Sequence, residues 1–185
     1  MRMNGLRDSR RRRTARGEQT SFDELFRECV GDVHGYALSL VGERAAAEDV
    51  TALAFERLFR ARRRLDPQRG TPRALLFTIA RNAALDELRR RRRQPLATLA
   101  AEELLAAPAV TGEAEDVERR ESVRQALAAL PVREREVVLL KFHGQLSNAE
   151  LAQALGISES NAGTRLSRAL ARLRAGELGA AEEVA

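Results

Sequence analysis

Apolar residues recur at helical spacing along most of the chain, and no segment alternates apolar and polar residues as a strand does. From Phe22 onward the apolar positions lie three or four residues apart. The same period returns after Ala45, after Pro72 and in four shorter segments beyond residue 114. Alanine and leucine dominate these segments and β-branched runs are scarce, which favours helix over sheet. The pattern predicts an all-α protein with three or four helices before the break at residue 94 and four after it.

Breaks in the period divide the chain into two small helical domains. Pro95, Pro108 and Gly112 interrupt the middle of the chain, as in a flexible linker. The first residues are arginine-rich and have no apolar period, which is typical of disorder. We therefore expect a disordered basic tail, a helical domain, a linker, a second helical domain and a frayed tail, at residues 1–20, 21–93, 94–114, 115–176 and 177–185.

The net charge of +5 is distributed unevenly. Residues 55–93 carry thirteen arginines against four acidic residues, whereas residues 21–54 carry two arginines against seven acidic residues. A basic block of this kind favours a polyanionic partner, nucleic acid before membrane, and the acidic block suits docking on a protein. The arginine run 89–93 suits phosphate contacts at a helix C-terminus, although a solvated charge run has the same sequence.

Composition argues against an enzyme. One cysteine, Cys29, and two histidines, His34 and His143, provide no set of metal ligands. No phosphate-binding loop or nucleophile motif is present. We expect no catalytic residue, metal, cofactor or small-molecule substrate. No apolar run reaches the length of a membrane span and no signal peptide is recognisable, so the expected location is the cytoplasm.

The segment "SNAELAQALGISESNAGTRLSRALARLR" (147–174) has the pattern of a helix-turn-helix. Ser147 and Glu150 form a capping box that begins a short helix. Gly156 suits the left-handed residue that ends it, and Ser158 suits the cap of the next helix. Two helices joined by a short glycine turn define the helix-turn-helix, whose second helix enters the major groove of DNA.

The second helix of this pair is apolar on one side and polar on the other. The polar side carries Asn161, Arg165, Arg168 and Arg172. Small residues between them let a backbone approach DNA, while arginine reaches guanine or phosphate. An ordinary solvated helix face is the alternative. The apolar side consists of Ala162, Leu166, Ala169, Leu170 and Leu173.

These residues resemble a known family. The segment "ALAALPVREREVVLLKFHGQLSNAELAQALGISESNAGTRLSRALARLR" (126–174) is similar to region 4 of bacterial RNA polymerase sigma factors, above all the extracytoplasmic-function (ECF) group, which keeps only regions 2 and 4. "AEDVTALAFERLFR" (47–60) resembles the region 2 helix that binds the clamp of the largest polymerase subunit. "RGTPRALLFTIARNAALDELRRRRR" (69–93) resembles the segment that reads and opens the minus-ten element.

The resemblance implies a non-enzymatic subunit that directs core RNA polymerase to promoters, with duplex DNA, the melted strand and an anti-sigma factor as further partners. It places the protein in the bacterial cytoplasm, on the nucleoid through polymerase. The tether would let the two domains reach two DNA sites. The implied polymerase contacts are Glu48, Asp49, Phe55 and Arg57. The implied minus-ten contacts are Asp66, Arg69, Thr71, Asn82, Asp86, Arg89 and Arg90. The implied minus-thirty-five contacts are Ser160, Asn161, Thr164, Arg165, Ser167 and Arg168.

The chain departs from the family pattern at a few positions. Ala52 and Leu53 replace a polar and an acidic residue on the clamp-binding helix, and Leu75 replaces a frequent tryptophan. Ala162 and Gly163 stand where a β-branched and a basic residue are common, which affects the expected sequence preference at the minus-thirty-five element.

Two other functions fit parts of the sequence. A stand-alone helix-turn-helix regulator would use its N-terminal bundle to sense a ligand or to dimerise, and would bind a palindromic site without polymerase. A protein-interaction adaptor would show neither promoter-specific DNA contact nor transcription.

Overall fold

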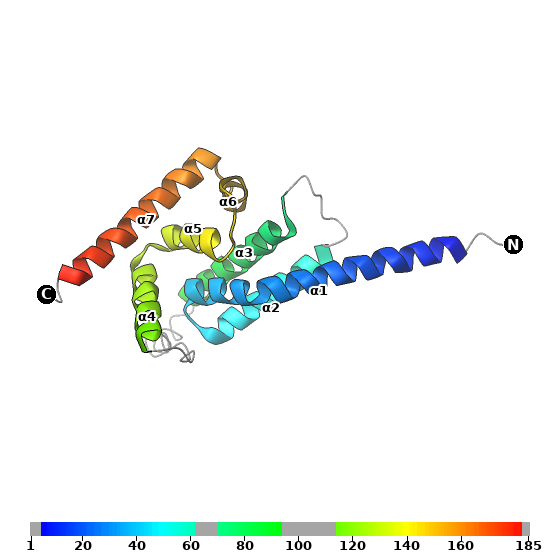
Figure 1. The fold of residues 1–185 in the computed structure, drawn as a ribbon, viewed down its shortest axis with the longest axis horizontal. Helices are drawn as coiled ribbons and strands as arrows, with labels where there is room; N and C mark the ends of the chain where they lie inside the picture. Colours follow the sequence, from blue (N-terminus) through cyan, green and yellow to red (C-terminus); the bar gives the residue numbers. More distant parts are fainter. Residues whose placement is uncertain (1–4, 62–69, 94–113, 183–185) are drawn as a thin grey trace.

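The computed structural model describes residues 5–61, 70–93 and 114–182, with side chains placed in 22–61, 70–93 and 121–175. Every regular element in these segments is a helix, so the all-α prediction is confirmed (Figure 1). None of these helices is long and apolar enough to cross a membrane. The helices are α1 (Gly5–Val41), α2 (Arg44–Ala61), α3 (Pro72–Arg92), α4 (Ala114–Ala129), α5 (Val132–Phe142), α6 (Asn148–Leu155) and α7 (Glu159–Glu182).

The first and last helices are longer than the sequence predicted. We expected disorder over residues 1–20, but α1 already begins at Gly5. Arginine is a good helix former and no proline interrupts this segment, so the helix continues N-terminally without an apolar stripe. Helix α7 likewise continues past Gly176 to Glu182. The predicted linker lies outside the described residues except at Ala114.

Helices α1, α2 and α3 pack as a bundle, which we call the N-terminal half (Figure 1). Phe22 and Phe26 of α1 meet Phe55 and Phe59 of α2 edge to face, with ring centroids 4.7 to 6.3 Å apart. Aromatic pairs in this geometry add to the energy gained from area burial. The largest fully buried side chains of the half are Val33, Tyr36, Leu40, Leu58, Leu76 and Phe77.

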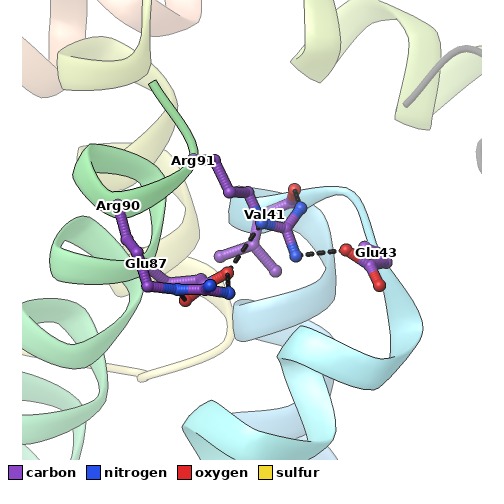
Figure 2. A network of polar contacts seen from close by, with 5 residues as sticks. All are labelled: Val41, Glu43, Glu87, Arg90 and Arg91. Atoms are coloured by element: carbon purple, nitrogen blue, oxygen red, sulfur yellow. Dashed lines mark hydrogen bonds and ion pairs between the residues drawn. The ribbon is translucent and has the colours of Figure 1, made fainter. Parts of the chain in front are cut away.

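Arg91 ties the end of α3 to the turn between α1 and α2. Its Nε donates to Glu87 at 2.7 Å, and its Nη2 pairs with Glu43. Its Nη1 reaches the carbonyl oxygen of Val41 at 3.4 Å. Figure 2 shows this guanidinium between the two helix ends, with Glu87 also bonded to Arg90. A three-way arginine contact of this kind fixes the relative positions of the bundle's helices.

Helices α4 to α7 make up the C-terminal half, in which tight turns set the helix order. A Cβ atom at Gly144 would lie only 2.4 Å from the carbonyl oxygen of Leu140, so the turn after α5 requires glycine. Lys141 donates to the carbonyl oxygen of Leu146 at 2.9 Å across the same turn. Helix α7 then crosses both α5 and α6.

The two halves share one hydrophobic core, although the sequence predicted separate domains on a tether. Helices α5 and α6 pack against α1 and α3. Val137, Leu140 and Leu151 of the C-terminal half belong to the same buried cluster as Tyr36 and Phe77 of the N-terminal half. No local period marks this contact, because it joins residues far apart in the sequence.

Candidate nucleic-acid interface

The turn between α6 and α7 has the geometry that the capping residues predicted. The side chain of Ser147 accepts from the backbone N–H of Glu150 at 3.2 Å, and Glu150 accepts in return from the N–H of Ser147 at 2.9 Å. Gly156 ends α6 with a φ of +66°, in the left-handed region that favours glycine. Ser158 then accepts from the N–H of Asn161 at 3.3 Å. Both helix ends are thus fixed, as a helix-turn-helix requires.

The N-terminal part of α7 has a polar side that points away from the core. Arg165, half-buried, donates from Nε to Asn161 Oδ1 at 3.1 Å, one helical turn back. Thr164 donates to the carbonyl oxygen of Ser160 at 2.9 Å. The Asn161 contact holds the Arg165 guanidinium in one direction, which lowers the entropic cost of reaching a base or phosphate. The exposed residues of this face are Ser160, Asn161, Thr164, Ser167 and Arg168.

Arg172, which the sequence placed on the same face, has a structural contact. Arg172 is exposed and pairs at 3.0 Å with Glu134 of α5, which is partly buried. Opposite the polar face, Ala162 and Ala169 are fully buried, and Leu166 packs against them. Gly163 has no heavy atom within 4 Å of where a Cβ would stand, so packing does not require glycine there.

Helix α3 carries a second polar face. Thr71 caps the helix, with Oγ1 accepting from the N–H of Ala74 at 3.1 Å. Asn82, Asp86 and Arg89 are exposed and share one side of α3, at positions i, i+4 and i+7. Asp86 and Arg89 pair with each other at 2.8 Å.

Two of the predicted minus-ten residues, Asp66 and Arg69, lie outside the described residues. The oxygen Oγ1 of Thr71 also donates to Glu150 Oε1 of α6 at 2.6 Å, and this bond lowers the pKa of Glu150. The N-terminal end of this predicted DNA surface is therefore in contact with the other half of the protein.

The arginine run at the end of α3 is only partly available to a ligand. Arg90 donates two hydrogen bonds to Glu87, at 2.7 and 2.8 Å. These bonds, together with those from Arg91, lower the pKa of Glu87 to about 2. Arg92 and Arg93 are exposed. Arg91 contributes to the fold rather than to a surface, and nothing in the sequence marked Glu43 as its partner.

The predicted polymerase site on α2 has three exposed members and one buried one. Glu48, Asp49 and Arg57 are exposed, and Glu48 accepts from Arg44 at 3.0 Å. Phe55 is 5% exposed and packs against Phe22 and Phe26, so it is a core residue rather than a surface contact. The exposed, largely acidic stripe on α2 comprises Ala45, Glu48, Asp49, Ala52 and Glu56.

An apolar groove of about 360 Å³ lies between α4, α5 and α7, and sequence analysis missed it. Phe142 on its wall is 62% exposed. The signal was present, because Phe142 continues the apolar stripe of α5 beyond Val138 and Leu139. Its other lining residues include Val123, Leu127, Leu170, Leu173 and Arg174.

Comparison with known proteins matches both halves. Residues 25–94 match the family model Sigma-70 region 2, and residues 120–173 match Sigma-70, region 4. The ECF RNA polymerase sigma factor RpoE of Cereibacter sphaeroides is 30% identical over 93% of this chain and 91% of its own length. The chain belongs to the sigma-70 family of RNA polymerase sigma factors. It is of the ECF type and directs promoter recognition by RNA polymerase through regions 2 and 4.

A further relative agrees with this assignment, and a solved structure shares the fold. The probable RNA polymerase sigma factor RfaY of Xanthomonas campestris is 32% identical over 86% of this sigma factor, which spans 41% of the length of RfaY. The sigma factor RpoE of Bartonella quintana, solved with the anti-sigma factor NepR, has the same fold, with a TM-score of 0.67. That match has 22% identity and covers 83% of this chain and 94% of the other. Like its family, this sigma factor is not an enzyme.

Proposed function

We propose that the N-terminal half of α7 reads the minus-thirty-five element. The observation that carries this proposal is the polar face on a turn fixed at both helix ends, with Arg165 held by Asn161. The contacts are made by Ser160, Asn161, Thr164, Arg165, Ser167 and Arg168, and Arg172 stays with Glu134. Region 4 then comprises residues 115–176, and Gly163 leaves room for the DNA backbone.

Region 2, residues 21–93, binds core polymerase and handles the minus-ten element under the same proposal. The exposed stripe of α2 that includes Glu48 and Asp49 meets the polymerase, with Arg57 beside it. The exposed face of α3, with Asn82, Asp86 and Arg89, meets the melted strand, because phosphates attract its basic end. The remaining proposed minus-ten contacts are Asp66, Arg69, Thr71 and Arg90.

Run-off transcription with purified core polymerase on a library of genome fragments tests this function. We expect discrete start sites that depend on the protein, and a loss of at least about tenfold in their yield for Arg165→Ala/Arg168→Ala. The double variant Arg124→Ala/Arg133→Ala removes the same charge from α4 and α5 and is the matched control. It should keep its start sites.

A stand-alone regulator would give a different result. It would bind a DNA fragment specifically in the absence of polymerase and produce no start sites. Equal losses for the two double variants would show that net charge, rather than the α7 face, carries the binding.

An anti-sigma factor is the proposed regulatory partner. The support is the fold shared with RpoE of Bartonella quintana, which was solved bound to such a factor. The proposed location is the bacterial cytoplasm, where core polymerase and promoter DNA are found.

A further inference from the structure

Helix α1 extends well beyond the bundle that it helps to form. It has 37 residues, whereas α2 has 18 and α3 has 21. Phe22, where the described side chains of α1 begin, already packs on Phe59 near the end of α2. Residues 5–21, which we call the N-terminal extension, lie before this contact and project from the bundle in Figure 1 (dark blue). At about 1.5 Å per residue, the extension is about 25 Å long.

The net charge of α1 reverses where the extension meets the bundle. The extension carries six arginines and two acidic residues, a net charge of +4. The rest of the helix, residues 22–41, carries one arginine and four acidic residues, a net charge of −3. Arginines three or four positions apart, such as Arg7, Arg10 and Arg11, repel one another along a helix. Because bound anions would relieve this repulsion, the extension suits a polyanionic partner and the rest of α1 does not.

The extension has no apolar stripe with which to dock on a protein or to enter a lipid surface. Leu6 and Ala15 are its only apolar residues besides glycine, and their spacing puts them on opposite sides of the helix. Helices that bind a protein groove or lie in a membrane interface need a continuous apolar face. Successive residues are about 100° apart on a helix, so positions 10–13, all arginine, surround most of its circumference. The partner must therefore offer negative charge on more than one side.

A groove of duplex DNA has this arrangement of charge. The major groove is about 12 Å wide, admits an α-helix and is bordered by a row of phosphates on each side. The major groove of duplex RNA is too deep and narrow for side chains to read. We therefore favour duplex DNA over RNA, protein and lipid as the partner. At about 3.4 Å per base pair, the extension would follow about seven base pairs.

The extension leaves the bundle at the end where α3 begins. Arg73, in the first turn of α3, donates to Asp32 of α1 at 2.5 Å and to the carbonyl oxygen of Gly144 at 2.7 Å. Arg91, at the other end of α3, reaches the carbonyl oxygen of Val41 at 3.4 Å. Helices α1 and α3 therefore run in the same direction, and the extension points beyond the start of α3.

We propose that the N-terminal extension of α1 is a further DNA-binding element of this sigma factor, which lies in a groove of the duplex next to the minus-ten element and binds its phosphates. The proposed minus-ten contacts Asp66, Arg69 and Thr71 precede α3 in the chain or cap it, which brings the adjoining duplex to this end of the bundle. Phosphate contacts carry no sequence information, so the extension adds affinity for any promoter rather than choosing among promoters. Its place beside the minus-ten element rests on the proposed function above, whereas its binding of duplex DNA does not.

Binding of the full chain to a fluorescently labelled DNA duplex tests this element. The probe has about 30 base pairs of mixed sequence and no promoter, so that phosphate contacts dominate its binding. The main variant is Arg10→Gln/Arg11→Gln/Arg12→Gln/Arg13→Gln, which we call the glutamine variant. Glutamine is also a good helix former, and far-UV circular dichroism checks that the helix content is unchanged.

We expect the glutamine variant to bind the duplex at least about tenfold more weakly at about 0.1 M salt, because four phosphate contacts are lost. The slope of log K against log salt concentration should become shallower by about 3 to 4. Lysine at the same four positions keeps the charge. The lysine variant should therefore stay within about threefold of the natural protein and keep its salt dependence.

A second control removes the same charge from exposed positions elsewhere. It is Arg44→Gln/Arg60→Gln/Arg133→Gln/Arg174→Gln, and it should weaken binding by no more than about threefold. Equal losses in this control and in the glutamine variant, or unchanged binding of the glutamine variant, would overturn the proposal. Tighter binding to RNA of the same sequence, or to vesicles of phosphatidylglycerol and phosphatidylethanolamine, than to the DNA duplex would overturn it as well.

Hydroxyl-radical footprinting of the holoenzyme locates the element on a promoter found by run-off transcription. We expect protection of about seven base pairs next to the minus-ten element that disappears in the glutamine variant, while the start site remains. Protection that persists in this variant would overturn the placement. If start sites appear but duplex binding does not depend on the extension, only this inference fails. If duplex binding depends on the extension and no start site appears, the proposed function fails while the DNA-binding extension stands.

Discussion

The bundle of α1, α2 and α3 contributes most of the buried residues of the shared core, whereas region 4 adds a smaller number to it and has a small separate cluster besides. Tyr36, Leu58 and Phe77 of the bundle are fully buried in this core, and Tyr36 packs edge to face on Phe77. Among the described residues of region 4, one small cluster is separate from the shared core, with Leu130, Val138 and Ala169 as its buried members. Region 2 is therefore the more self-sufficient unit, and the contact between the two halves contributes more to the stability of region 4.

The dependence of region 4 on a shared core follows from its small size. Small helical units bury a low fraction of their surface and gain stability by packing against a neighbour. A region that shares its core can also exchange that neighbour for another surface, such as polymerase or a regulator. Region 4 is thus suited to conditional packing, and region 2 to serving as the fixed platform.

The largest expected effect comes from the bundle core. Phe77→Ala removes a fully buried ring that packs edge to face on Tyr36 and lies 5.4 Å beneath the Arg73 guanidinium. We expect a loss of about 3–5 kcal/mol in the free energy of unfolding, measured by urea denaturation.

The matched control is Phe142→Ala in region 4. Phe142 is 62% exposed, so its loss should change the free energy of unfolding by no more than about 0.5 kcal/mol. Similar losses at Phe77 and Phe142 would contradict the view that the bundle is the stable platform.

Local signals in the sequence predicted the helices and turns of region 4 well, but they did not predict how region 4 packs on region 2. The capping box at Ser147, Gly156 in the turn and the polar stripe of α7 all depend on residues within a few positions of one another, and the structure has each of them. Phe55 was misplaced because helical spacing alone does not distinguish a surface aromatic residue from one that packs on α1. The role of Arg73 was missed because its partners are up to 71 residues away.

Acid should loosen the interface before it unfolds the bundle. Burial lowers the pKa of His143 at the interface below its usual 6.5, although nearby Asp32 opposes the shift. The neutral ring of His143 therefore stabilises the contact between the two halves fully above pH 6.5, and this contribution is lost as the pH falls through the lowered pKa. In the bundle, Arg90 and Arg91 lower the pKa of Glu87 from 4.5 to about 2. The contribution of Glu87 to the stability of the bundle is therefore lost only as the pH falls from 4.5 to about 2.

Small-angle scattering and circular dichroism at pH 7.5, 5.5 and 3 separate the two transitions. The radius of gyration should rise between the first two values while the helix content stays constant. One titrating group changes the equilibrium between packed and separated halves by at most about tenfold per pH unit. His143→Gln should remove the rise, and a rise that persists in this variant would assign the effect to another group.

Substitutions on the exposed stripe of α2 in region 2 should have the smallest effect on the free energy of unfolding. Glu48 and Asp49 lie on the surface, and Glu48 forms an exposed pair with Arg44. Exposed pairs contribute little, so Glu48→Ala and Asp49→Ala should each change the free energy of unfolding by no more than about 0.5 kcal/mol. If this stripe meets polymerase, each variant should weaken core binding by about threefold to tenfold, with a steeper loss at low salt.

Asp23→Ala and Glu24→Ala remove the same charge from exposed positions on α1 and are the controls. A similar weakening in the controls would mean that the acidic block acts through its overall field, since a specific contact on α2 would spare α1.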